Sequence, residues 1–399
     1  MKFRFSRALI ATVASASMVF GATVVAPSWA KPNYPSAAEV AAAKRNVAAK
    51  KLMIARIEKI VQDLAVEANK LGRVAQIKGE AFNQAQDAVD AMTAKVNSLQ
   101  SQADAANAEA NKAKAQLGQI AAQMYRDGSG GTSLNLFLNA GKASDLLYQL
   151  GAQEKVAQQS DTIYNRSMAK QKYAQSLTDE LAGAKAELAT KAASAKALFT
   201  VAQTAANEVQ AKVDENNRLN KTFYAQLAVL QNTSADLERQ RAEGLAAEAR
   251  QNAGTSKPIA PELYAVGDPD SAKVQIALDF AKANLGERYV LGGMGPDVWD
   301  CSGITKAAYA AAGVFIGTHS ATNQFNTLAA ARKLVPLSQW QTGDLIWYSQ
   351  DSSFNGDKYH VAIYLGGEMM LEAPNPARTV RIVPVRYGEL FPYAGRPTA

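Results

Sequence analysis

Apolar residues recur every seven positions along the first part of this 399-residue chain. One series begins at Val40 and ends at Met124, and a companion series three residues later is filled mostly by Ala, Leu, Ile and Met, with interruptions at Lys50 and Lys78. A heptad pattern with both seam positions filled predicts a supercoiling helix that packs against a partner helix. An unbroken helix over residues 37–126 would be roughly 135 Å long.

The pattern stops at a glycine-rich stretch, residues 127–131, and an apolar segment follows over residues 134–138. Periodicity resumes near Leu146, and the second run has apolar residues at intervals of seven from Leu181 to Leu237, with the polar Asn216 in the seam. Two similar helical runs around a glycine break predict an antiparallel coiled-coil hairpin arm over residues 37–250, with its break near residues 127–145. The apolar segment at the break is either a partner site or a self-packed elbow.

A different pattern follows the arm. Residues 251–270 contain Gly and Pro and predict a linker. Residues 271–399 then mix helical and strand patterns, which predicts a small α+β domain. Its expected helices cover residues 272–284 and 304–312, and its expected strands cover residues 342–348, 360–365 and 369–372.

Composition supports this division and excludes several functions. All thirteen prolines lie outside residues 36–257. Three of the seven excess positive charges lie in the first seven residues, so the remaining chain is too weakly basic for a nucleic-acid surface. A single cysteine and two histidines exclude an internal disulfide framework and a multi-cysteine metal site, and we predict no metal and no cofactor.

The first thirty residues have the features of a secretory signal. Lys2, Arg4 and Arg7 precede a mostly apolar stretch, and a small-residue site ends at Ala30. The alternative is an uncleaved anchor helix, because the apolar run approaches the length that spans a membrane. Both interpretations place the remaining chain outside the cytoplasm, where a lone thiol is unusual.

Candidate catalytic residues lie in the C-terminal domain. Cys301 stands where a helix is expected to begin, and the free amides there favour a thiolate. His360 opens a strand, and Glu372 lies on the next one. If the turn between them is centred on Gly366, the two side chains are directly opposed on one face, with Cβ atoms about 5 Å apart. A slip of one residue would put Glu372 on the other face.

A nucleophile, a base and an acid in this order favour a cysteine hydrolase. The non-catalytic interpretation is that Cys301 is a small buried residue and that His360 is structural. His319, on a loop with no strand acid opposite it, is a competing base.

The blocks YVLGG, DCSG, TGDLIWY, HVAIYLGG and LEAP resemble the NlpC-type papain-like cysteine peptidases of bacterial cell walls. The resemblance covers about 110 residues from Gly286. It implies that Cys301 is the nucleophile, His360 the base and Glu372 the third polar residue, a position more often occupied by His. It also implies that Tyr289 lies at the oxyanion site, that Asp300 and Ser302 line the acyl-donor pocket, and that Ser320 belongs to the substrate site.

The long hairpin before such a domain is similar in architecture to secreted division hydrolases whose arm docks on an FtsX-type membrane protein. That likeness implies an arm that restrains the enzyme until its partner engages. The function expected from the sequence is a secreted endopeptidase that cuts peptidoglycan stem peptides between D-glutamate and the diamino acid. The alternatives are a non-catalytic adaptor that recruits other hydrolases, and a hydrolase of another amide or an ester.

Overall fold

The computed structural model describes residues 34–126, 143–252 and 256–399. The proposed signal segment, the glycine-rich break at residues 127–131 and the apolar segment after it lie outside these ranges. The helices are α1 (Ala37–Ala43), α2 (Val47–Arg126), α4 (Ala143–Gln231), α5 (Ala235–Asn252), α6 (Ser271–Ala283), α7 (Cys301–Ala311) and α8 (Ala321–Ala330). The strands are β1 (Arg288–Tyr289), β2 (Val298–Trp299), β3 (Leu334–Pro336), β4 (Leu345–Ser349), β5 (Lys358–Gly366), β6 (Met369–Glu372), β7 (Arg381–Pro384) and β8 (Leu390–Gly395), with a 3₁₀ turn at Leu337–Gln339.

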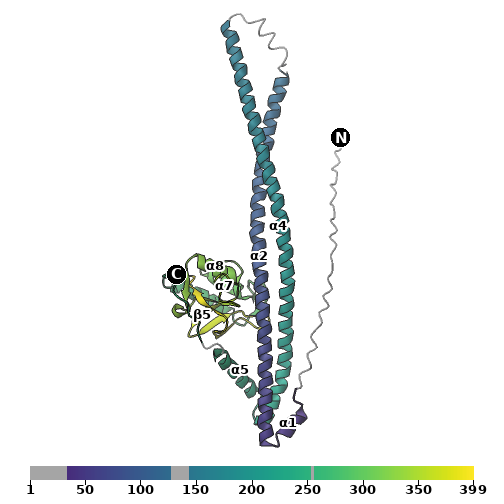
Figure 1. The fold of residues 1–399 in the computed structure, drawn as a ribbon, viewed down its shortest axis with the longest axis vertical. Helices are drawn as coiled ribbons and strands as arrows, with labels where there is room; N and C mark the ends of the chain where they lie inside the picture. The colour runs from purple at the N-terminus through teal and green to yellow at the C-terminus, as the bar shows by residue number, and fades with distance from the viewer. Residues whose placement is uncertain (1–33, 127–142, 253–255) are drawn as a thin grey trace.

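The two long helices α2 and α4 pack side by side, and the C-terminal domain lies against α2 (Figure 1). Ion pairs join Lys212 to Glu67 and Lys170 to Glu109. The residue numbers of the partners therefore rise along α2 as they fall along α4. The helices are therefore antiparallel. The predicted fold class, long packed helices followed by an α+β domain, is confirmed.

Most of the predicted seam residues are buried between α2 and α4. Ile57, Leu64 and Leu230 form one cluster with Phe223, and Leu99 packs with Leu181 in another. Asn216, the polar residue in the seam, is buried and donates a hydrogen bond from Nδ2 to the carbonyl of Leu64 at 2.8 Å. This bond pairs the Nδ2 group with the backbone of α2, whereas Oδ1 is buried without a hydrogen-bond partner among the described residues.

The helical region departs from one continuous hairpin at two places. The helix expected from residue 37 breaks at residues 44–46, and the Asn46 side chain accepts hydrogen bonds from the amides of Ala48 and Ala49 to start α2. Val47 is consequently 75% exposed although it fits the heptad. The second run ends at Gln231, because Asn232 adopts a φ of 58°, and α5 turns back toward the C-terminal domain (Figure 1).

The C-terminal domain is built on a six-stranded sheet in the order β3-β8-β4-β5-β6-β7. Helices α6, α7 and α8 supply Leu278, Ile304 and Phe325 to a core shared with Trp347 and Ile363 of the sheet. The other face of the sheet packs Tyr348, Ala362 and Met370 together with Ile77 of α2. Among the residues that the structure describes, no helix combines the length and hydropathy needed to cross a bilayer.

Candidate active site

Cys301 is the first residue of α7, as expected from the sequence. Asp300 caps this helix with its side chain, which accepts a hydrogen bond from the amide of Gly303 at 2.8 Å. The backbone amides of Val361 and Ser302 lie near the Cys301 thiol and act to lower its pKa. Val361 follows His360 on β5, so helix α7 brings the thiol against the strand that carries the candidate base.

His360 and Glu372 form a buried pair. Both side chains have 0% exposure, and His360 Nε2 lies 2.8 Å from Glu372 Oε2. Because the ionised carboxylate only accepts, Nε2 carries the proton and Nδ1 is the free base nitrogen. Nδ1 is buried without a hydrogen-bond partner among the described residues. The pair has the arrangement that orients an imidazole for proton transfer.

The register that brings this pair together differs from the predicted one. Ile363 pairs with Leu371. Extended by one residue along each strand, this register puts Glu372 opposite Ala362 and not opposite His360. The turn residues Gly367 and Glu368 both have positive φ, 56° and 58°, so the hairpin turns beyond Gly366. The shift is two residues, which keeps Glu372 on the face of His360 and lets the carboxylate reach it diagonally.

The electrostatics of the site oppose the thiolate that the helix start was expected to favour. Burial raises the pKa of Cys301 well above its ordinary value, the carboxylates of Asp300 and Glu80 add to this, and the amides of Val361 and Ser302 oppose it. Burial lowers the pKa of His360 against the opposing effect of Glu372. In this conformation the prediction of a lowered thiol pKa is wrong, because the thiol is buried and the carboxylates of Asp300 and of Glu80 on α2 lie near it.

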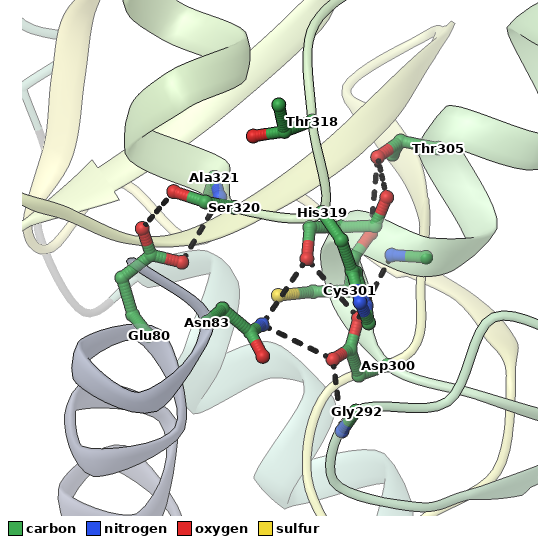
Figure 2. Close-up of polar contacts among 12 residues, drawn as sticks. Glu80, Asn83, Gly292, Asp300, Cys301, Thr305, Thr318, His319, Ser320 and Ala321 are labelled. Atoms are coloured by element: carbon green, nitrogen blue, oxygen red, sulfur yellow. Dashed lines mark hydrogen bonds and ion pairs between the residues drawn. The ribbon is translucent and has the colours of Figure 1, made fainter. Parts of the chain in front are cut away.

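Asp300 and Ser302 precede and follow Cys301 in the chain and belong to one hydrogen-bond network. Figure 2 shows Asp300 beside Cys301. Asp300 Oδ1 accepts from the Ser302 hydroxyl at 3.1 Å, and Oδ2 accepts from the amide of Gly292 at 3.2 Å. His319 Nε2 lies 2.8 Å from Asp300 Oδ1. Burial lowers the pKa of His319, but the Asp300 carboxylate outweighs it and the pKa is raised. His319 therefore pairs with Asp300 rather than with the Cys301 thiol.

Tyr289 and Ser320 complete the set of predicted site residues. Tyr289 is buried on β1, and burial together with Asp300, Cys301 and Glu80 raises the pKa of its phenol. Ser320 caps α8 by accepting a hydrogen bond from the amide of Asn323. Gln324, one turn further, donates from Nε2 to the carbonyl of Ser302 at 2.8 Å and so connects α8 to the start of α7.

The sequence analysis missed the residues of α2 that enter this site. The Glu80 carboxylate is buried, and it accepts from the Ser320 hydroxyl at 2.6 Å and from the amides of Ala321 and Thr322 at 2.9 and 3.0 Å. Figure 2 shows Glu80 and Asn83 reaching from one helix toward the segments that carry Ser320 and Cys301. Burial raises the pKa of Glu80 to about 7, because these hydrogen bonds only partly offset desolvation.

Asn83 occupies the neighbouring position. Its Nδ2 donates to Asp300 Oδ2 at 3.2 Å and to the Ser302 hydroxyl at 3.4 Å, so its amide lies across the two residues that flank Cys301. Cys301, between them, is 6% exposed and belongs to the core of the C-terminal domain.

Further contacts extend along the same face of α2. Gln76 donates to the carbonyl of Pro374, Gln84 donates to the Thr322 hydroxyl, Arg73 pairs with Glu389, and Asp87 accepts from the Thr318 hydroxyl. These residues recur at intervals of three and four, so they share one side of the helix.

Glycines permit this close approach of α2. A Cβ built at Gly72 would lie 2.8 Å from Asn375 Nδ2, and one built at Gly79 would lie 3.1 Å from Leu291 Cδ1. Two glycines seven residues apart inside a helix disfavour the helix and fill no seam position. They were the signal in the sequence for a second packed face on α2.

Comparisons with known proteins agree with this geometry. Residues 286–390 match the family described as the NlpC/P60 family. The chain is 38% identical over 104 residues to peptidoglycan endopeptidase RipA of Mycobacterium tuberculosis, which covers 26% of this chain and 20% of that protein. It is 38% identical over 98 residues to peptidoglycan endopeptidase RipB of the same species, which covers 25% of this chain and 36% of that protein.

A third relative is the protein named gamma-D-glutamyl-L-lysine dipeptidyl-peptidase of Bacillus cereus. It is 33% identical over 119 residues, covering 30% of this chain and 34% of that protein. The chain thus spans about a third or less of the length of these relatives, and the similarity lies in the C-terminal domain. That domain is an NlpC/P60 domain, of a cysteine peptidase family, as its motifs indicated.

Proposed function

We propose that this chain is a secreted peptidoglycan endopeptidase in which Cys301 attacks a peptide carbonyl of the stem peptide. The observation that carries the proposal is the buried His360–Glu372 pair with its free imidazole nitrogen, because His360 directly precedes Val361, whose amide lies near the Cys301 thiol. The names of the three relatives support the cell wall as the substrate. The printed name of the Bacillus cereus protein supports cleavage between D-glutamate and the diamino acid.

The proposed reaction proceeds in two halves. The Cys301 thiol passes its proton to His360, and the thiolate forms an S–C bond to the carbonyl carbon. The amide of Cys301 and the Tyr289 hydroxyl stabilise the oxyanion. The C–N bond then breaks as the His360 imidazolium protonates the leaving amine, which leaves a thioester. Water, deprotonated by His360, hydrolyses the thioester and restores the thiol.

Asp300, Ser302 and Ser320 are proposed to contact the substrate. Each now bonds to α2, since Asn83 covers Asp300 and Ser302 and Glu80 covers Ser320. The arm thus occupies the polar groups that a stem peptide would use. This overlap supports an arm that holds the enzyme inactive, and substrate entry then requires α2 to leave the domain.

A partner must supply the energy that separates the arm from the domain. The helical region extends well beyond the C-terminal domain on both sides (Figure 1). A protein bound to the arm far from Cys301 could therefore move the side of α2 that contacts the C-terminal domain. We propose that this partner is an FtsX-type membrane protein and that the enzyme acts in cell division or daughter-cell separation. The architectural resemblance of the arm supports this assignment.

The test is the cleavage of purified muropeptides by the full chain and by Cys301→Ala, with products identified by mass spectrometry. We expect a new amine on the diamino acid with the wild type, and a loss of at least about 10³-fold in rate with Cys301→Ala, because the nucleophile is removed. The same pair is compared in a Gly79→Trp background, where an indole beside Leu291 displaces the covering arm and the uncovered site is measured. Equal product with and without Cys301 in the Gly79→Trp background would contradict the proposal and favour the adaptor.

A further inference from the structure

The Glu372 carboxylate has more partners than the orientation of one imidazole requires. In addition to His360, it accepts hydrogen bonds from Arg386 Nη1 and Nη2 at 2.9 and 2.8 Å, one on each oxygen. Arg381 donates to Oε1 from Nε and Nη2 at 3.1 and 2.8 Å. The bidentate contact of Arg386 fixes the plane of the carboxylate, because a rotation would break one of the two parallel bonds.

Arg386 is itself tied to the strand on the other side of His360. Its backbone amide donates to the Tyr348 hydroxyl at 3.2 Å, and its guanidinium lies 4.8 Å from the centre of the Tyr348 ring. Tyr348 pairs with His360 in the β4–β5 register, and the two rings are 5.5 Å apart. Arg386 therefore links both neighbours of the imidazole, Glu372 and Tyr348.

We infer that Arg386 is a positioning residue that aims His360 at the thiol by fixing the Glu372 carboxylate, with Arg381 as a second support. The inference deepens the proposed function and rests on it for the identity of the reaction. Neither arginine contacts the thiol or reaches a substrate-binding residue. Both act through the carboxylate, so their effect is on the orientation and charge of the imidazole.

The charges predict how removing Arg386 would show itself. The charged groups that act on His360 are Glu372, Arg386 and Arg381, and the ring of Tyr348 lies beside it on the sheet. Burial lowers the pKa of His360, Glu372 opposes this, and Arg386 and Arg381 lower it further. Removing the Arg386 cation therefore raises the pKa of His360, whereas Arg386→Lys keeps the charge and loses only the fork.

The experiment compares the wild type, Arg386→Lys and Arg386→Met as full chains. His360 is titrated by NMR on protein with labelled histidine, and His319→Gln assigns the second of the two histidines. We expect the His360 midpoint to rise in Arg386→Met and to stay near the wild-type value in Arg386→Lys. We also expect kcat on muropeptides to fall about 10²-fold in both variants with little change in KM, because the imidazole is misplaced.

Arg332→Met is the matched control, since this exposed arginine lies over the Tyr264 ring, away from the site. A wild-type kcat and a wild-type His360 midpoint in Arg386→Met would overturn the inference. If Arg386→Met does not fold, the test rests on Arg386→Lys. A wild-type kcat in Arg386→Lys would then overturn the positioning role of Arg386. The absence of cleavage by every protein, with Gly79→Trp included as the uncovered enzyme, would contradict the proposed function, while the titration still tests the effect of Arg386 on His360.

Discussion

Helix α2 has two packed faces, and they are chemically opposite. Toward α4 it presents Leu64, Ala75 and Leu99 in a mostly apolar seam. Toward the C-terminal domain it presents Gln76, Glu80 and Asn83, whose contacts are hydrogen bonds to backbone and side-chain groups. Apolar contacts hold two helices together permanently, whereas exposed polar groups regain water partners when a polar face separates. The difference indicates a stable arm with a releasable covering face.

Energetics support this division of roles. Each hydrogen bond to a charged group contributes roughly 1.5–3 kcal/mol, and a neutral one about 1 kcal/mol. Glu80 also loses hydration when it is buried against neutral donors, which offsets part of its gain. A face held by a few such bonds is closed at rest and opens under a modest force or a competing ligand.

The largest expected effect is a loss of turnover when the candidate base, His360, is replaced in the site that the polar face of α2 covers. His360→Gln should lower turnover by at least about 10³-fold, because the base is lost, whereas His319→Gln should lower it by less than about tenfold, because His319 bonds Asp300. Turnover on muropeptides measured for both variants checks this. A larger loss in His319→Gln than in His360→Gln would mean that the wrong histidine is assigned as the base.

A smaller effect is expected from pH. The pKa of Glu80 is about 7 when docked, and it returns toward the ordinary value of 4.5 when the arm leaves. The docked state therefore holds a proton more tightly, so docking is strongest below about pH 4.5 and weakens by at most about tenfold per pH unit up to pH 7. Burial raises the pKa of Asp87 as well, which acts in the same direction.

Small-angle X-ray scattering across this range measures the separated fraction, with Glu80→Gln as the matched control. We expect the separated fraction of the wild type to increase as the pH rises. In Glu80→Gln this pH dependence should be weaker, and Asp87 is the group on this face of α2 that still contributes to it. A wild type that becomes more compact as the pH rises would contradict the role of Glu80.

The sequence predicted the architecture better than the site. The heptads gave the long helices because burial repeats with the helical period, and the alternation of β5 and β6 brought Glu372 to the side of His360 even though the turn was misplaced. The breaks at Asn46 and Asn232 were missed because single capping residues carry little signal within long periodic runs.

The covering of the site could not be derived from local patterns. Glu80 and Asn83 appear in the sequence as ordinary polar residues between seam positions, and their partners are more than two hundred residues away. The thiol was expected to be ionised from its place at the start of α7 alone. Its surroundings are completed by α2, and only the tertiary structure shows that.

The most direct test of the covering face is the alkylation rate of Cys301, the only cysteine in the chain. Gly79→Trp places an indole where even a Cβ would lie 3.1 Å from Leu291, and Gly118→Trp makes the same change on α2 where nothing lies within 4 Å. We predict that iodoacetamide modifies Cys301 at least about tenfold faster in Gly79→Trp than in the wild type, and at the wild-type rate in Gly118→Trp. Equal rates in all three proteins would contradict an arm that covers the thiol.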